Sequence, residues 1–99
     1  MLIAILDLRT AATDRAAALA QLDSEREEIR TMPGNLDFRV YAAHDDHEAV
    51  AVIHEWADEP SFAVYLSSEA FARSGAAIRP LVTAPPISRR FLADLLETV

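Results

Sequence analysis

Residues 48–61 read EAVAVIHEWADEPS, and this stretch decides the fold because a strand pattern runs directly into a helix start. One alternating face carries Val50, Val52, His54 and Trp56. This two-residue period is typical of a β-strand with one buried face. The acids at positions 58 and 59 and the proline at 60 are favoured in the first turn of a helix. We therefore predict a strand over 48–56 that leads into a helix.

Upstream, a second alternating run predicts a strand that pairs with the first. Its apolar side carries Leu36, Phe38, Val40 and Ala42. The polar segment His44–His47 lies between the two runs and is typical of a hairpin loop. Before them, Pro33 and Gly34 suit the central positions of a type II turn, which ends the preceding element.

The N-terminal third predicts one strand and one long helix. Residues 2–8 are apolar on both alternating faces up to Asp7, which indicates a strand covered on both sides. Residues 13–32 follow the helical period, with Asp14 as the expected N-cap. The expected apolar face carries Ala16, Leu19, Leu22, Arg26 and Ile29. The solvated face is expected to carry Asp23, Glu25, Glu27 and Glu28.

The C-terminal third predicts two helical pieces and a final strand. Helical spacing begins at Phe62, and Ser67–Ser68 starts a second piece that Pro85–Pro86 stops. Apolar residues of 87–99 follow a helical period, but a strand is needed to complete the fold, so we expect a strand over at least the first half. The resulting order predicts an α+β, ferredoxin-like split βαβ fold with a four-stranded antiparallel sheet. At 99 residues, the chain is expected to form a single domain, 1–99.

The first strand also bears on assembly. Helices cover only one face of a four-stranded sheet of this kind, and the other face should then be polar. Ile3 and Ile5 make it apolar instead. A second copy of the chain is the simplest cover, and we therefore expect a homodimer.

Composition excludes several classes of function. A formal charge of −7 argues against a nucleic-acid partner, and the absence of cysteine removes thiolate metal sites. The longest apolar run, residues 1–6, is too short to span a bilayer and lacks the basic start of a signal peptide. We expect a cytoplasmic protein with no membrane partner. Polar clusters such as His44 to His47 in a short hairpin are usually part of the loop and only rarely bind a metal, so no metal is expected.

Four segments, Met32–Leu36, Phe38–Tyr41, His54–Glu59 and Ser61–Ser68, occur at a characteristic spacing, and Phe71 follows them. Over nearly the whole chain they resemble the antibiotic biosynthesis monooxygenase family of the dimeric α+β barrel group. The resemblance implies a homodimeric barrel. It also implies oxygenation of electron-rich aromatic quinols or anthrones by molecular oxygen, without metal, flavin or haem. In that chemistry the deprotonated substrate itself donates an electron to oxygen.

Carried over residue by residue, the family pattern is kept at the tryptophan, which is Trp56. The family's Asn four residues earlier is Val52 here. Its Tyr six residues after the tryptophan is Phe62, and the His found in many members nine residues after it is Tyr65. A haem-degrading branch of the same fold uses an axial His at the position of Gly75, so haem degradation is not expected.

Two residues are the candidate catalytic groups. His54 shares the face of Trp56 and is the candidate general base, because the ordinary pKa of imidazole lies near 6.5. A satisfied structural histidine is the alternative. Tyr65 would hold a substrate oxygen, or it would anchor its helix to the sheet.

The candidate substrate-binding residues are Trp56, Phe62, Phe71, Asp7 and Arg73. Trp56 and Phe62 would pack against substrate rings, although Trp56 also suits a core position. Burial would raise the pKa of Asp7 and make it an acid or base. The alternative is an ion pair of Asp7 with one of three arginines, namely Arg9, Arg39 or Arg90. Arg73 and Arg79 lie on the helix expected to cover the cavity and could steady an anion.

The leading prediction is a cofactor-independent monooxygenase that acts on a small aromatic or quinol-type molecule. The alternatives are a non-catalytic small-ligand-binding or stress-response dimer of the same fold, and a purely structural interaction domain. A pocket packed solid by Trp56 and Phe71 would favour the structural role. A roomy apolar pocket with His54 turned inward would favour a ligand.

Overall fold

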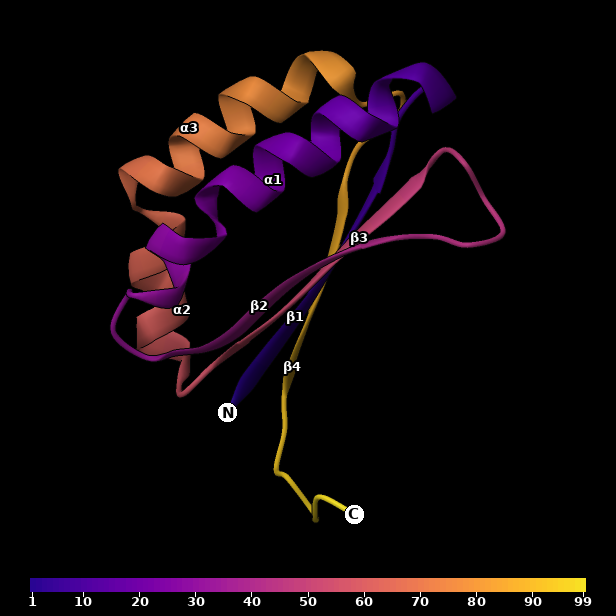
Figure 1. The fold of residues 1–99 in the computed structure, drawn as a ribbon. Coiled ribbons are helices and arrows are strands. Elements are labelled where there is room, and N and C mark those ends of the chain that lie inside the picture. Colours follow the sequence, from indigo (N-terminus) through magenta and orange to yellow (C-terminus); the bar gives the residue numbers. More distant parts are fainter.

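The computed structural model describes residues 1–99 as a four-stranded sheet with helices on one face (Figure 1). The strands are β1 (Leu2–Arg9), β2 (Asn35–Ala42), β3 (Ala49–Trp56) and β4 (Ile87–Leu92). The helices are α1 (Arg15–Arg30), α2 (Glu59–Leu66) and α3 (Glu69–Ile78), with short 3₁₀ turns η1 (Ala12–Asp14) and η2 (Arg79–Leu81). The strand order is β2-β3-β1-β4, and all neighbouring strands are antiparallel. This is the predicted ferredoxin-like arrangement.

The core lies between the sheet and the helices. On β3 the buried residues are Val50, Val52, His54 and Trp56, which confirms the predicted face. They alternate with half-buried residues on the other side of the strand. Trp56 has no exposed surface at all, at 0%. The strand therefore positions His54 and Trp56, two residues apart, on the same covered side of the sheet.

The turn before β2 depends on glycine. Gly34 has a φ of 82°, which a residue with a Cβ rarely adopts. The Ser61 side chain also lies against Gly34, where a Cβ would be. The register then shifts between Asn35 and Asp37, which is a β-bulge. The bulge leaves Leu36 56% exposed, so the prediction that Leu36 shares the buried face of Phe38 is wrong.

Helix α1 corrects the expected solvated face. Its buried residues are Ala18, Leu22, Glu25 and Ile29. The sequence predicts Glu25 on the solvated face, yet it is only 4% exposed. The Nε atom of Arg73 on α3 donates to Glu25 Oε1 over 2.9 Å and so compensates part of the cost of burying a carboxylate. Asp14 stands at the N-cap as predicted, but its side chain makes no capping hydrogen bond.

A side-chain cap marks the start of each of the helices α2 and α3. Asp58 Oδ1 accepts a hydrogen bond from the Ser61 backbone N–H over 2.8 Å at the start of α2. Ser68 Oγ accepts one from the Phe71 backbone N–H over 3.2 Å at the start of α3. These contacts confirm both predicted helix starts and set α3 across the sheet beside α1 (Figure 1).

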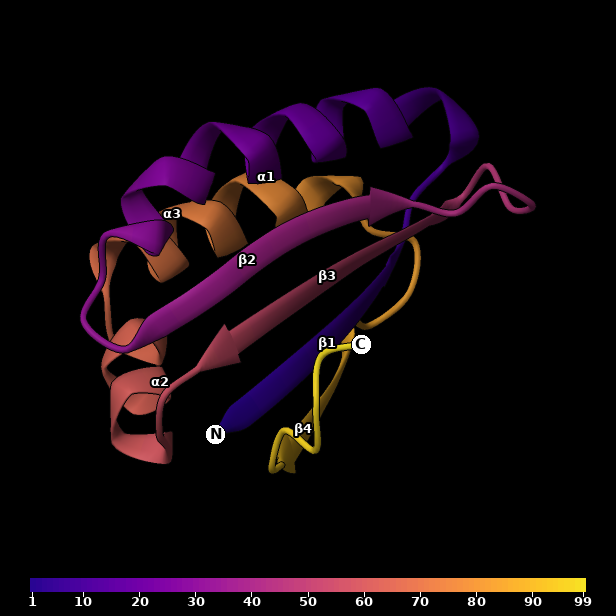
Figure 2. The same ribbon diagram turned by 60° about the horizontal axis from the view of Figure 1, so that its bottom comes forward.

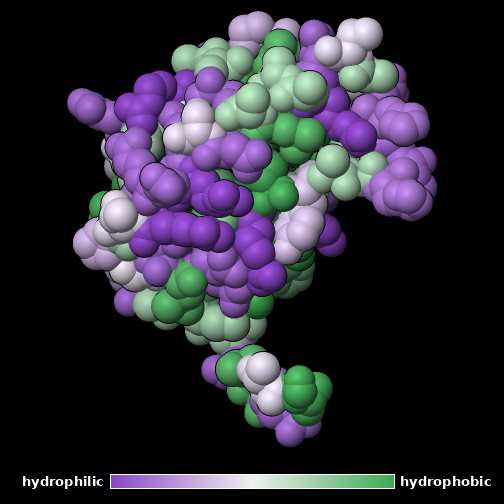
Figure 3. Space-filling model, viewed as in Figure 1, coloured by the Kyte–Doolittle hydropathy of each residue, from purple (hydrophilic) through white to green (hydrophobic).

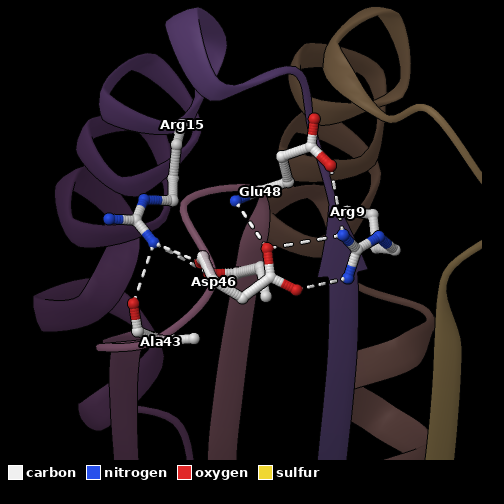
Figure 4. Close-up of polar contacts among 6 residues, drawn as sticks. Arg9, Arg15, Ala43, Asp46 and Glu48 are labelled. Carbon is white, nitrogen blue, oxygen red and sulfur yellow. Dashed lines mark hydrogen bonds and ion pairs between the residues drawn. The ribbon is translucent and has the colours of Figure 1, made fainter.

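Two arginines organise the loop between β2 and β3 (Figure 4). Arg9 donates to Asp46 Oδ2 over 2.9 Å and to Glu48 Oε1 over 3.2 Å. Arg15 donates to the backbone carbonyl of Asp46 over 2.8 Å and to that of Ala43 over 3.1 Å. The hydrogen bond from Arg9 lowers the pKa of Asp46 below its usual range. The polar residues of this loop therefore hold its conformation.

No element covers the other face of the sheet (Figure 2). On this face β1 and β3 place Ile3, Ile5 and Ile53 beside the exposed Ile87 and Phe91 of β4. β4 confirms the strand expected in the first half of residues 87–99. Residues 93–99 form no regular structure and project from the body with exposed apolar side chains (Figure 3).

Candidate functional site

A cavity of about 250 Å³ lies between α3 and the helix-facing side of the sheet. Nine of its fourteen lining residues are hydrophobic. Its hydrogen-bonding side chains are those of His54, Tyr65, Ser74 and Arg79. A largely apolar hollow with a few polar groups is typical of a small-molecule site. Because a cavity of roughly 150 Å³ already accepts benzene, there is room here for a substituted ring or two fused rings.

The imidazole of His54 is fixed by its neighbour on β3. Trp56 Nε1–H donates to His54 Nδ1 over 2.9 Å, and this bond is buried. An indole N–H can only donate, so Nδ1 carries no proton. The proton of the neutral imidazole is therefore on Nε2. His54 presents a hydrogen-bond donor at that atom.

Burial keeps this imidazole uncharged. Removal from water and, to a smaller extent, the positive charge of Arg90 together lower the pKa of His54 to about 4. Arg90 stands on β4, where its guanidinium carbon lies 5.0 Å from the centroid of the Phe62 ring. The prediction that His54 accepts a proton does not fit this arrangement, because one nitrogen is occupied by Trp56 and the other already bears hydrogen.

Tyr65 supplies a second uncharged donor. It lies on α2, lines the cavity and packs edge-on against Phe71, with ring centroids 5.3 Å apart. Burial and, to a smaller extent, the nearby negative charge of Glu25 together raise the pKa of Tyr65 to about 12. The fully buried polar side-chain atoms without a partner are Glu25 Oε2 and Arg26 Nε. The Tyr65 hydroxyl is not among them and makes no hydrogen bond within the chain, so it is available to a ligand.

Trp56 and Phe62 stand behind the cavity wall rather than in it. Trp56 stacks on Tyr65 at 5.0 Å between ring centroids, and the Phe62 ring lies 5.7 Å from that of His54. Neither residue lines the cavity. The expectation that they contact substrate is therefore corrected: they support the two residues that do face the cavity. Phe71 does line it and is 39% exposed.

The remaining two candidates lie elsewhere. Asp7 is exposed on the uncovered face of the sheet, where Arg89 Nη2 lies 3.5 Å from its Oδ2. The expected burial of Asp7 is wrong, and its partner is none of the three arginines considered. Arg73 is engaged by Glu25 and Glu28 of α1. Its guanidinium therefore links two helices instead of facing the cavity.

Glu25 is the residue that sequence reasoning missed. Its neighbours along the helix are acidic, which suggested solvent. The useful signal was its spacing, because positions 18, 22, 25 and 29 follow the period of a core-facing helix stripe. Glu25 lies three residues after Leu22, which lines the cavity.

The structure contains neither a cluster of metal-binding side chains nor a membrane-spanning helix. No group of three or more histidine, aspartate or glutamate side chains is arranged to hold a metal ion. None of the helices combines the length and the apolar content that crossing a bilayer requires.

The sequence pattern of the family described as "Antibiotic biosynthesis monooxygenase" matches residues 1–76, which include β1 to β3 and the residues of the cavity up to Gly75. The chain belongs to the antibiotic biosynthesis monooxygenase family. This membership confirms the resemblance drawn from the sequence motifs and supports a general monooxygenase-like role. Among curated proteins, no sequence matches significantly.

Solved structures share the fold of this antibiotic biosynthesis monooxygenase domain. One of them is a protein of Deinococcus radiodurans that is named as a candidate antibiotic biosynthesis monooxygenase. It superposes with a TM-score of 0.91 at 17% sequence identity, and the match covers 100% of this chain and 98% of the Deinococcus chain. A candidate antibiotic biosynthesis monooxygenase from Nitrosomonas europaea has a TM-score of 0.88 at 13% identity, and the match covers 94% of this chain and 98% of the other. A Mycobacterium tuberculosis protein gives 0.86 at 19% identity, with 99% and 98% covered. At such identities the likeness shows the fold alone.

Proposed function

We propose that the protein is a cofactor-independent monooxygenase that acts on a small aromatic quinol or anthrone with molecular oxygen. One observation carries the proposal: His54 and Tyr65, two residues with uncharged hydrogen-bond donors, line one largely apolar cavity. Such a pair is suited to stabilising an oxyanion on a bound aromatic ring. The volume and the apolar lining of the cavity favour a ligand-binding role over a purely structural one.

The two donors would act on the substrate oxygen. Binding lowers the pKa of the substrate hydroxyl, so that its proton leaves to water and the ring becomes an electron-rich anion. This anion transfers an electron to oxygen, and the radical pair combines into a carbon–peroxide bond. At an anthrone-type CH₂ carbon, loss of water then leaves a ketone, so that CH₂ and O₂ become C=O and H₂O. In this scheme His54 and Tyr65 remain donors throughout.

We further propose that the working unit is a homodimer closed across the uncovered sheet face. The apolar residues there include Ile3, Ile5, Ile53 and Phe91. The charged residues of the same face are paired with one another, since Arg89 lies beside Asp7, and Arg39 lies beside Asp37 and Glu55. A self-complementary face of this kind suits a two-fold contact with a second copy.

Oxygen consumption tests the proposed activity. A panel of hydroquinones and anthrones is added to the protein in an oxygen-electrode cell, with His54→Asn as the matched variant. Consumption above the rate of autoxidation that falls in the variant is expected. Binding of these compounds without any protein-dependent oxygen consumption would instead identify a non-catalytic ligand-binding module.

A further inference from the structure

Arg79 is the one arginine whose side chain has no hydrogen-bond or ion-pair partner. The chain has nine basic residues, all arginine, against sixteen acidic ones. The other eight contact a side-chain or backbone oxygen of the protein. Arg79 is exposed, and its guanidinium is therefore free to form a charge-assisted hydrogen bond with an anionic ligand. The same residue is also the only lining group of the cavity that carries a charge near neutral pH.

The Arg79 guanidinium lies beside α3, close to Gly75. Arg79 follows the last residue of α3, and Arg79 Nη2 lies 3.9 Å from the point that a Cβ on Gly75 would occupy. Gly75 also lines the cavity. Glycine inside a helix is unfavourable relative to alanine, and Gly75 has no positive φ that would demand it. A Cβ at Gly75 would make only an ordinary contact with the guanidinium, so Gly75 serves only to mark where along α3 the charge of Arg79 lies.

The same helix sets the distance between the charge and the two donors. Phe71, at the start of α3, contacts Tyr65. The Arg79 guanidinium lies one turn further along, beside Gly75. Four residues of helix span roughly 6 Å, which is comparable to the length of a small ring system. The Arg79 end and the Tyr65 end of the cavity are therefore separated by about the length of a small ring system.

We propose that the cavity takes a planar aromatic acid of one or two rings, with its carboxylate on Arg79 and a ring hydroxyl, at the opposite end, on His54 and Tyr65. This inference deepens the proposed function and rests on it for the role of the donor end. The carboxylate contact itself requires no reaction. Arg79 is then a specificity-determining residue that selects acids over neutral quinols.

Calorimetric binding of two redox-stable probes tests the inference without any turnover. The probes are 6-hydroxy-2-naphthoic acid and its uncharged partner, 6-hydroxy-2-naphthamide. The acid should bind the wild-type protein more tightly. Arg79→Gln should weaken binding of the acid about tenfold or more, which is the size expected for the loss of a hydrogen bond to a charged group. It should leave the affinity for the amide unchanged. Arg30→Gln, which removes an equal charge outside the cavity, should alter neither affinity.

Other outcomes overturn the proposal. Equal affinity for acid and amide, equal weakening of both by Arg79→Gln, or no binding of either probe would each refute a carboxylate site at Arg79. The isomer 1-hydroxy-2-naphthoic acid, whose two groups are adjacent, should bind less tightly than the 6-hydroxy acid, and equal binding would refute the end-to-end placement. A preference for the acid that persists without oxygen consumption by any quinol or anthrone, including ones that carry a carboxylate, would reject the oxygenase and leave this inference standing.

Discussion

The indole N–H of Trp56 donates to Nδ1 of His54 over 2.9 Å, and both groups are buried. This single contact decides what the histidine can do. It leaves a proton on Nε2, the nitrogen that remains for the cavity, and so makes His54 a donor to an oxyanion rather than an acceptor of a substrate proton.

Two substitutions of His54 separate these roles. The amide oxygen of His54→Asn can replace Nδ1 as acceptor for Trp56, but it leaves no donor at the Nε2 position. The amide of His54→Gln reaches that position with an N–H group and has no basic nitrogen. We expect His54→Asn to lower the oxygenation rate about a hundredfold, as for the loss of one oxyanion donor, and His54→Gln to retain much more activity.

Rates per folded protein, with the folded fraction measured by circular dichroism, provide the comparison. Gln and Asn variants that are equally inactive would mean that the imidazole is needed as a base. The Gln variant is informative here because it cannot accept a proton at neutral pH.

The buried imidazole also makes stability depend on pH. The pKa of His54 is about 4 in the folded protein and about 6.5 in an unfolded chain. Between these values the unfolded state binds the proton first, so stability falls as the pH drops from 6.5 towards 4 and is unaffected by this group above 6.5. The loss amounts at most to about 3 kcal/mol.

Urea unfolding at pH 7 and pH 4.5 measures this effect, with His54→Asn as the matched control. The variant keeps an acceptor for Trp56 but cannot titrate, so the carboxylates contribute equally to both proteins. The wild type should lose more stability than the variant between the two pH values. Parallel losses would show that His54 titrates normally in the folded state.

The fold was largely predictable from the sequence, because it depends on local patterns. Alternation over 48–56, the Asp58 cap and the Ser68 restart each specify an element by itself. The bulge at Leu36 was not predictable, since it arises from pairing with β3. The segment 93–99 kept a helical period without forming a helix, because nothing packs against that apolar face.

The site was only partly predictable. His54, Tyr65 and Phe71 do border one cavity, as their pattern suggested. Which aromatic residue lines the cavity and which supports it depends on how far α2 and α3 stand from the sheet, and no periodicity reports that distance. The tautomer of His54 follows from a side-chain contact within one strand, which alternation permits but does not specify.

The two glycines give opposite predictions for stability. Gly34 combines a φ of 82° with contact to the Ser61 side chain, so Gly34→Ala should destabilise by about 2 kcal/mol or more. Gly75 lies in a helix, where a Cβ would meet only ordinary contact with Arg79, so Gly75→Ala should be neutral or stabilise by up to about 1 kcal/mol. Thermal and urea unfolding of both variants would test this, and a Gly34→Ala protein as stable as the wild type would contradict the turn geometry.

Arg73 is expected to matter for stability although half of its side chain is exposed. It is the partner of Glu25, whose side chain is 5% exposed and whose Oε2 has no hydrogen bond. Arg73→Met would leave that carboxylate buried and unpaired, at a cost of about 1–3 kcal/mol. In the control Arg30→Met an exposed ion pair with Asp37 and a hydrogen bond to the Phe38 carbonyl are lost, but no buried charge is left unpaired, so the loss should be smaller, at about 1 kcal/mol. Equal losses in urea unfolding would show that the buried carboxylate does not depend on Arg73.

The uncovered sheet face provides a test of the proposed dimer. Ile5 lies near the middle of that face, between Ile53 of β3 and Arg89 of β4. A charge introduced by Ile5→Glu would have to be buried without a partner in a face-to-face dimer, which is costly, whereas in a monomer it would meet water. We expect sedimentation equilibrium to show a dimer for the wild type and a monomer for this variant. Val64→Glu, at a 67% exposed position of α2 on the other side of the molecule, should remain dimeric. A wild-type protein that stays monomeric at every concentration would refute the dimer, and a dimer that persists in Ile5→Glu would place the contact on another surface.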